Sequence, residues 1–357
     1  IRNLSGENED SVSGEGGIAL LIALLRSPSE STQEQAASAL WSMSTNERNQ
    51  AKIVAEGGIT PLKDCLRSPN KKVQEQCVGI IRNLSMNEAN EIPMMEEGIL
   101  PPLIELLSCD EERVVVEAAV AIQNLSMLSG NEAPIVQAGA IRGLVPLLSS
   151  EDPAVQDAAS GALANLSSFS DHDARIVQAN ALPALAKLVM SPHVVIAEHS
   201  TALLRNLTAY NAEIKMRAFE AGCLPPVVQL LRSREKTVLQ NSVATIRNLS
   251  FHPEVDSRPA PRAPRPSLLS LRVAAVSLSR SLSLSRTLSH SLSLSLLPVT
   301  KRAVSLLASA NRAVPVQVKV RLVEDGAVAN LVGLLAAADA EVQEHAAASL
   351  RNIMAES

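Results

Sequence analysis

A short phrase recurs along the chain at a nearly constant interval, and this interval restricts the fold more than any other feature. The phrase is an apolar residue, any residue and then Asn-Leu-Ser or a close variant, with its asparagine at positions 83, 124, 165, 206 and 248. Successive asparagines are 41 or 42 residues apart. A second phrase, a small or acidic residue followed by glycine and an apolar residue, recurs in step, for example at Gly98 and Gly139. Two markers that share one period indicate a chain built from repeated units.

The apolar residues within one period predict three helices. In the segment 131–167, residues 133–138 form a short helix that ends at Gly139, whose missing Cβ permits a left-handed turn. Apolar residues at helical spacing mark a second helix between positions 141 and 148, and Pro153 suits the first turn of a third. Hydrophobic residues make up 46% of the chain and aromatic residues only 1%. The core must therefore consist of aliphatic side chains, which suit closely spaced helices.

These features resemble the armadillo repeat family. Residues 220–231, Glu-Ala-Gly-Cys-Leu-Pro-Pro-Val-Val-Gln-Leu-Leu, follow the family pattern with little departure, and the resemblance covers residues 1–252 and roughly 316–357. The array looks most similar to β-catenin, plakoglobin and vacuolar armadillo scaffold proteins. The resemblance implies an all-α fold, a right-handed α-α superhelix of about seven three-helix repeats.

One interval breaks the period, because Asn248 and Asn352 are 104 residues apart and about 62 extra residues lie between them. A Pro/Arg-rich run at 258–266 is followed by alternating Ser and Leu at 277–297. Three interpretations compete: a disordered functional insertion, a strand without a partner, and a retained intron, since a CT-dinucleotide tract translates as Ser-Leu. We favour the intron. The predicted organisation is repeats at 1–252, the insert at 253–315 and a final repeat at 316–357.

The net charge of −5 conceals two parts of opposite sign. Residues 254–315 carry nine Lys or Arg and two Asp or Glu, whereas the rest of the chain carries 23 basic and 35 acidic side chains. An acidic solenoid with a net charge of −12 therefore surrounds a basic insert.

Signatures of catalysis are absent from the sequence. The six histidines form no HExxH pair, the four cysteines lack metal-ligand spacing, and the glycines at 14–17 do not form a phosphate loop. Asp171-His172-Asp173 is interpreted as a solvated turn. We expect no enzymatic activity, no cofactor and no metal site. No apolar run reaches the ~18 residues of a membrane span, and no signal peptide opens the chain, so we expect a location in the cytoplasm or also in the nucleus.

The resemblance implies that the third helices line a groove and that the recurring asparagines face it. This asparagine ladder comprises Asn83, Asn124, Asn165, Asn206 and Asn248, with Asn3 and Asn352 at its ends. Asparagine is a mediocre helix former, so its recurrence needs a cause. Each amide has donors and an acceptor that can pair with the backbone of an extended peptide. The alternative is that the asparagines cap helices or bridge adjacent repeats.

Arginines precede several ladder asparagines, and their guanidinium groups suit acidic ligand groups. The three predicted to contribute to the groove are Arg82, Arg205 and Arg247, and Arg351 has the same place in the last repeat. The alternative is that they are solvated or pair with acids of the next repeat. Acidic residues eight positions before the asparagines, such as Glu75, complement the dipole at the start of the third helix.

The predicted function is a scaffold or adaptor that binds extended segments of other proteins, with neither nucleic acid binding nor membrane insertion. An importin-α-like transport adaptor is a weaker alternative, because that family has tryptophan four residues before the asparagine. The positions here are occupied by residues such as Gly79, Val120 and Gly161, and the single tryptophan is Trp41. Another alternative is the substrate-binding region of a U-box ubiquitin ligase, because the chain begins at Ile1 without an initiator methionine and is expected to be a fragment. The oligomeric state does not follow from the sequence.

Overall fold

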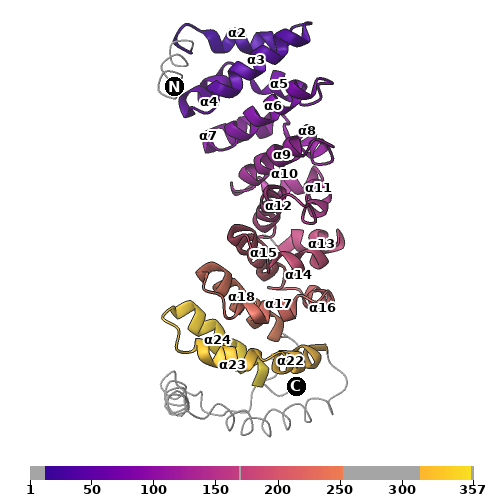
Figure 1. Cartoon of the computed structure of the whole chain (residues 1–357), viewed down its shortest axis with the longest axis vertical. Coiled ribbons are helices and arrows are strands. Elements are labelled where there is room, and N and C mark those ends of the chain that lie inside the picture. The colour runs from indigo at the N-terminus through magenta and orange to yellow at the C-terminus, as the bar shows by residue number, and fades with distance from the viewer. Residues whose placement is uncertain (1–12, 169, 252–313, 355–357) are drawn as a thin grey trace. The chain divides into compact units, whose positions relative to one another are not determined.

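The computed structural model describes residues 13–168, 170–251 and 314–354. Every regular element in these ranges is a helix (Figure 1), so the prediction of an all-α solenoid is confirmed. The chain divides into two compact units, Ile1–Ala181 and Leu182–Ser357, and each is described by itself.

The first unit is a succession of helix triplets of the predicted kind. Its described helices are α2 (Gly17–Leu24), α3 (Glu30–Met43), α4 (Glu47–Ala55), α5 (Ile59–Cys65), α6 (Lys71–Leu84), α7 (Glu88–Glu96), α8 (Leu100–Leu106), α9 (Glu112–Leu125), α10 (Glu132–Gln137), α11 (Ala140–Leu147), α12 (Pro153–Leu166) and α13 (Ser170–Gln178). The third helices α3, α6, α9 and α12 pack against one another in chain order, and each also packs against the second helix of its own triplet. Figure 1 shows this order along the unit.

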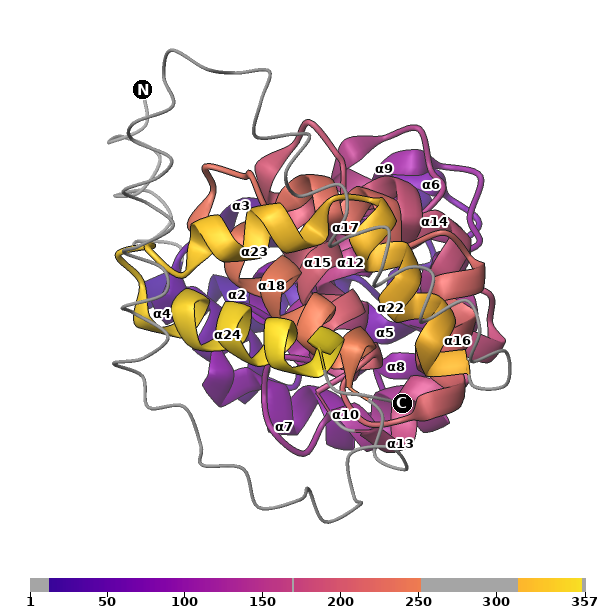
Figure 2. The ribbon, with the colours of Figure 1, turned by 90° about the horizontal axis from the view of Figure 1, so that it is seen from below.

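The second unit repeats the same arrangement. Its described helices are α14 (Leu182–Leu188), α15 (Val194–Leu207), α16 (Ala212–Glu220), α17 (Leu224–Leu230), α18 (Lys236–Ser250), α22 (Val314–Glu324), α23 (Ala327–Leu334) and α24 (Ala340–Met354). The third helices α15, α18 and α24 pack in this order, so the last repeat continues the array although residues 252–313 separate it from α18 in sequence. Figure 2 shows this last triplet of α22, α23 and α24 from below.

The predicted insert at 253–315 lies outside the described residues except at its end. Helix α22 begins at Val314, two residues before the predicted boundary of the final repeat. The interpretations of the insert as an intron, a strand or a disordered segment all stay predictions.

Local sequence explains where the helices begin and end. Asn70 and Asn211 accept hydrogen bonds from backbone N–H groups of the first turns of α6 and α16, which satisfies donors that have no partner inside the helix. Gly139 adopts φ 96° just before α11, a conformation that costs glycine no Cβ clash. Asn180 takes the equivalent place before α14 with φ 69°, as asparagine is one of the few other residues that tolerates it.

The core lies between the helices of successive triplets and is aliphatic, as the composition predicts. The leucine that follows the asparagine of the recurring phrase is buried: Leu84, Leu125, Leu166 and Leu207 are 0% exposed, and Leu249 is 4% exposed. Alanines such as Ala118 and Ala159 are equally buried on α9 and α12. The recurring phrase therefore places a leucine in the core and an asparagine beside it at the end of each third helix.

Candidate functional site

The ladder asparagines lie at equivalent places near the C-terminal ends of the third helices. Asn83, Asn124 and Asn165 lie on α6, α9 and α12 of the first unit, and Asn206, Asn248 and Asn352 lie on α15, α18 and α24 of the second. Asn83 and Asn352 are 6% and 3% exposed, whereas the other four are partly exposed. Asn3 lies outside the described residues. The repeat thus brings the predicted residues into register within each unit.

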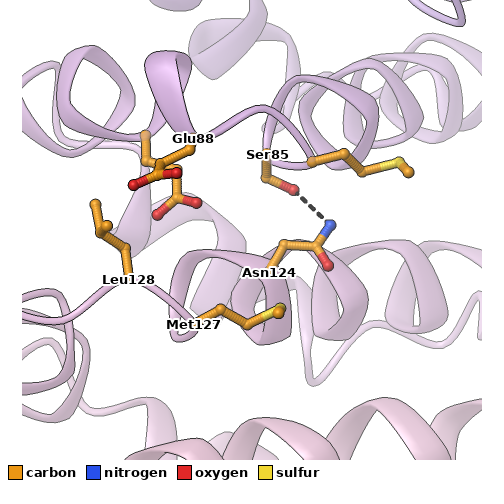
Figure 3. A pocket seen from close by; sticks show the side chains of 7 residues that line it. Ser85, Glu88, Asn124, Met127 and Leu128 are labelled. Carbon is orange, nitrogen blue, oxygen red and sulfur yellow. Dashed lines mark hydrogen bonds between the residues drawn. The ribbon is translucent and has the colours of Figure 1, made fainter.

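In the first unit, each ladder amide is hydrogen-bonded to the preceding repeat. The Nδ2 atoms of Asn83, Asn124 and Asn165 donate to serine Oγ atoms at 2.9, 3.0 and 3.0 Å. The three acceptors belong to the preceding Asn-Leu-Ser or equivalent phrase: Ser44, Ser85 and Ser126. Figure 3 shows the pair Asn124 and Ser85.

The serine of the phrase has a second role in the same network. Ser85 Oγ donates to the carbonyl oxygen of Arg82 at 2.7 Å, and Ser126 Oγ donates to that of Gln123 at 2.6 Å. Each hydroxyl therefore closes its own helix end while accepting the amide of the next repeat. The asparagine amide, the serine hydroxyl and the backbone carbonyl oxygen thus all have hydrogen-bond partners. Leaving such a group without a partner in a buried place would cost free energy.

The second unit contains the same bridge, in which the acceptors are backbone carbonyl oxygens and a serine hydroxyl. Asn248 Nδ2 donates to the carbonyl oxygen of Arg205 at 3.0 Å. Asn352 Nδ2 lies 3.4 Å from both Ser250 Oγ and the carbonyl oxygen of Arg247. These hydrogen bonds support the alternative role of the asparagines, which is to bridge adjacent repeats. Their contact with a peptide stays a prediction.

The arginines before the asparagines lie along the seam between adjacent third helices. Arg82 Nη1 is 3.4 Å from Asn83 Oδ1, and its Nε is 3.7 Å from Glu117 Oε2 on α9. In the second unit, Arg205 Nη1 donates to Asn241 Oδ1 on α18 at 2.7 Å.

Arg247 is exposed and its Nη1 lies 3.3 Å from His345 Nδ1 on α24. Burial, and then the charge of Arg247, lower the pKa of His345. Each arginine therefore meets the residue seven positions before the next ladder asparagine. Arg82 and Arg205 are partly exposed, and Arg247 is exposed.

Acidic side chains of the third helices pair with the following repeat. Glu34 lies 3.2 Å from Lys72 Nζ, and Glu75 lies 3.3 Å from Arg113 Nη1. Glu75 was expected to complement the dipole at the start of its helix, but the first turn of α6 contains no acidic residue. Glu75 lies beyond that turn and pairs with Arg113 of α9 instead. Such exposed pairs contribute little, about 0–1 kcal/mol each.

A pocket of about 410 Å³ adjoins this network on the first unit (Figure 3). It lies between the turn from α6 to α7 and the turn from α9 to α10, and it is lined by Ser85, Met86, Glu88, Glu91, Asn124, Met127 and Leu128. Met86 and Met127 are 65% and 73% exposed. The pocket combines an amide and a hydroxyl of the ladder with thioether side chains and two carboxylates.

Glu91 is the most perturbed group of this pocket. It is 5% exposed, and its Oε2 accepts a hydrogen bond from Asn131 Nδ2 at 3.1 Å. Burial, followed by the charge of Glu88, raises the pKa of Glu91 to about 7, although the bond from Asn131 acts in the opposite direction. A cation beside Glu91 would stabilise the charged form of this buried carboxylate.

Sequence reasoning missed this group, although a signal was present. Acidic residues recur 41 positions apart at Glu91, Glu132 and Asp173, and all three are at most 7% exposed. The interpretation of Asp171-His172-Asp173 as a solvated turn is wrong for Asp173. It lies in helix α13, is 3% exposed, and its Oδ1 has no hydrogen-bond partner among the described residues. Burial raises its pKa to about 7.

The contact of Trp41 with the next third helix was also missed from the sequence. Its indole ring lies against Gly79 of the next third helix, where an added Cβ would be 2.8 Å from Nε1. The ring is 40% exposed, so it covers the position four residues before Asn83 from the neighbouring helix. The absence of a side chain at Gly79 was the signal for this close approach.

No three His, Cys, Asp or Glu side chains within the described residues cluster in a way that could hold a metal ion. None of the helices given above combines the length and the apolar character that a membrane crossing needs.

Comparison with solved structures identifies designed repeat proteins of this architecture. The chain is 26% identical to the designed armadillo repeat protein YIII(Dq)4CqI, with a TM-score of 0.61, over 65% of this chain and 99% of that one. A related design in complex with the peptide (KR)4 is 26% identical with a TM-score of 0.59, over 65% of this chain and 99% of that one. An engineered protein at 23% identity and a TM-score of 0.63 shares the fold over 97% of this chain and 90% of its own.

Comparison with curated protein sequences finds no match. The sequence model of the Armadillo/beta-catenin-like repeat matches seven times, at residues 7–45, 46–86, 87–127, 129–168, 170–209, 211–251 and 315–355. These matches cover most of the chain. The first contains the described helices α2 and α3, and each of the others coincides with one helix triplet. The chain therefore belongs to the armadillo/beta-catenin-like repeat family.

Proposed function

We propose that this protein is a non-catalytic scaffold or adaptor that binds extended segments of other proteins along the third helices. The observation that carries the proposal is the stripe of partly exposed side chains on α9. Val116, Glu117, Val120, Gln123 and Asn124 are partly exposed at helical spacing, while the rest of the helix after its first turn is buried. Helix α15 presents the equivalent stripe, because Glu198, His199, Ala202, Arg205 and Asn206 are partly exposed. On α6 and α12 the positions equivalent to Val120 are the buried Gly79 and Gly161, so the surface is wider on α9 and α15 than on α6 and α12.

The ladder network suits such a surface because it holds the surface in one conformation. In the first unit, each ladder amide donates a hydrogen bond to the preceding serine. A primary amide has two N–H donors and an oxygen with two lone pairs. The second N–H and the oxygen of the partly exposed Asn124 are suited to an extended backbone, which offers both donors and acceptors. Asn165 Nδ2 also donates to the carbonyl oxygen of Gln123 at 3.3 Å, so Oδ1 is the group that Asn165 offers to a peptide. A preorganised surface binds with a smaller entropic cost than a mobile one.

The designed relatives support this use of the fold. One is described as computationally designed for modular peptide recognition, and another was solved with the peptide (KR)4. The same surface would also serve as the substrate-binding region of a U-box ubiquitin ligase. No contact among the described residues favours that alternative over an adaptor, and the expected cytoplasmic or nuclear location stays a proposal.

The test is selection of binders from a displayed library of random linear peptides against the full chain. The affinity of a selected peptide is then compared between the wild type, Val120→Arg and Ile104→Arg. Val120 lies on the third helix α9, and Ile104 is a partly exposed aliphatic residue on the second helix α8. We expect Val120→Arg to weaken binding at least tenfold, roughly the effect of losing a central contact of ~1.4 kcal/mol, and Ile104→Arg to leave it unchanged. Equal effects of the two variants would contradict the proposal.

A further inference from the structure

We propose that the pocket between the α6–α7 and α9–α10 turns receives one lysine or arginine side chain of the bound peptide. The inference rests on the proposed function and adds the chemistry of one subsite to it.

The rim of the pocket fits the aliphatic part of such a side chain. Met86 and Met127 occupy the same position in successive repeats, three residues after the ladder asparagine, and both are largely exposed. Methionine is flexible and polarisable, so it adapts to irregular apolar groups. Lysine and arginine bury their methylene stems against apolar surface and keep the charged end at a polar group. Two exposed methionines beside a pocket therefore suit a long stem.

The inner part of the pocket fits the charged end. Glu91 Oε2 is held by Asn131 Nδ2, and no hydrogen bond is shown for its Oε1 within the described residues. Glu88 lines the same pocket one turn earlier on α7 and is exposed. Repulsion between Glu88 and Glu91, together with the burial of Glu91, disfavours having both carboxylates deprotonated in this pocket. A cation relieves both effects, an acidic side chain would add to them, and a neutral one would leave them uncompensated.

The position of the pocket connects it to the peptide surface. Asn124 and Ser85 line the pocket and also form the inter-repeat bridge, so a peptide on the third helix α9 passes next to the opening. The charge of the chain outside residues 254–315, with 23 basic and 35 acidic side chains, favours the approach of a basic segment.

The test uses methyl nuclear magnetic resonance of the full chain labelled at its eight methionines. The probe is acetyl-Ala-Lys-Ala-amide, and the matched peptide has norleucine in place of lysine. We expect the lysine peptide to shift the signals of Met86 and Met127 and to leave the exposed Met190 and Met354 of the second unit unchanged. Glu91→Gln should weaken the effect roughly tenfold, as expected for loss of a charge-assisted hydrogen bond. Glu96→Gln, on the same helix but outside this pocket, should not.

Several results would overturn the inference. An equal shift with the norleucine peptide would show a merely apolar pocket, and no shift with the lysine peptide would show no cation site. If replacing the nine basic residues of 254–315 with glutamine shifts Met86 and Met127 without peptide, the occupant is the chain's own segment. Library-selected peptides that bind without lysine or arginine and without shifting these two signals would leave the proposed function intact and refute the pocket. A lysine-dependent shift, combined with a library that yields no binder, would support the cation pocket and refute the proposed function.

Discussion

The bridge between ladder asparagine and serine can be measured with double-mutant cycles. In Asn83→Ala, the buried Ser44 Oγ loses the amide donor that now lies 2.9 Å away. Asn83 is 6% exposed and Ser44 is 0% exposed, so water cannot easily replace the lost bond. The coupling free energy of this pair should be about 1–1.5 kcal/mol. For Asn124 and Ser85, the partly exposed amide lets water compensate, and we expect about 0.5–1 kcal/mol.

The assay is denaturant unfolding of both sets of variants followed by far-ultraviolet circular dichroism, with the coupling taken from the two single variants and the double variant. Because stability in a repeat array is distributed over neighbouring units, both pairs are compared within one unit. A coupling near zero for Asn83 and Ser44 would refute the bridging role. A coupling larger for the partly exposed pair than for the buried pair would refute the reasoning from solvent access.

Three further predictions concern the core, a buried acid and the tryptophan. Leu125→Ala, at a 0% exposed position, should lower the free energy of unfolding by ~2–5 kcal/mol, measured by denaturant unfolding, and a loss well below this range would contradict tight packing there. The raised pKa of Asp173, about 7, means that the folded state holds its proton more tightly than the unfolded state, so stability is greatest below the ordinary aspartate pKa and is lost as the pH rises through about 7. Asp173→Asn should therefore raise the melting temperature at pH 8 relative to the wild type much more than at pH 5, and an equal difference at the two pH values would show that Asp173 does not titrate in this way. Gly79→Ala should displace the indole of Trp41, the single tryptophan, and shift its fluorescence emission to longer wavelength. The higher helix propensity of alanine, by ~1 kcal/mol, should offset the lost packing. Unchanged emission would contradict the close contact between Trp41 and Gly79.

The period and the spacing of apolar residues were sufficient to predict the helices and their grouping. Gly139 and Pro153 marked boundaries that the structure places at the start of α11 and α12. These features depend on local backbone preferences and on which residues must be buried, and both can be read along one chain. The position of Asn180 in the left-handed conformation follows from the same logic.

The partners of polar side chains were not predictable in the same way. The Asn-Leu-Ser phrase showed that asparagine and serine recur together, but their hydrogen bond joins residues 39 positions apart in different repeats. Asp173 looked solvated because its neighbours are polar, whereas helix α13 turns it into the protein. Burial of a polar side chain depends on how helices pack, which spacing alone does not determine.

Photo-crosslinking of a library-selected peptide tests the central claim of a peptide surface on the third helices most directly. The peptide carries a photoreactive residue, and the crosslinked sites on the full chain are mapped by mass spectrometry. The account predicts crosslinks concentrated on the partly exposed stripe of α9, at Val116, Val120 and Gln123, and on the neighbouring third helices α6 and α12. Crosslinks concentrated on the second helices α8 and α11 would contradict it.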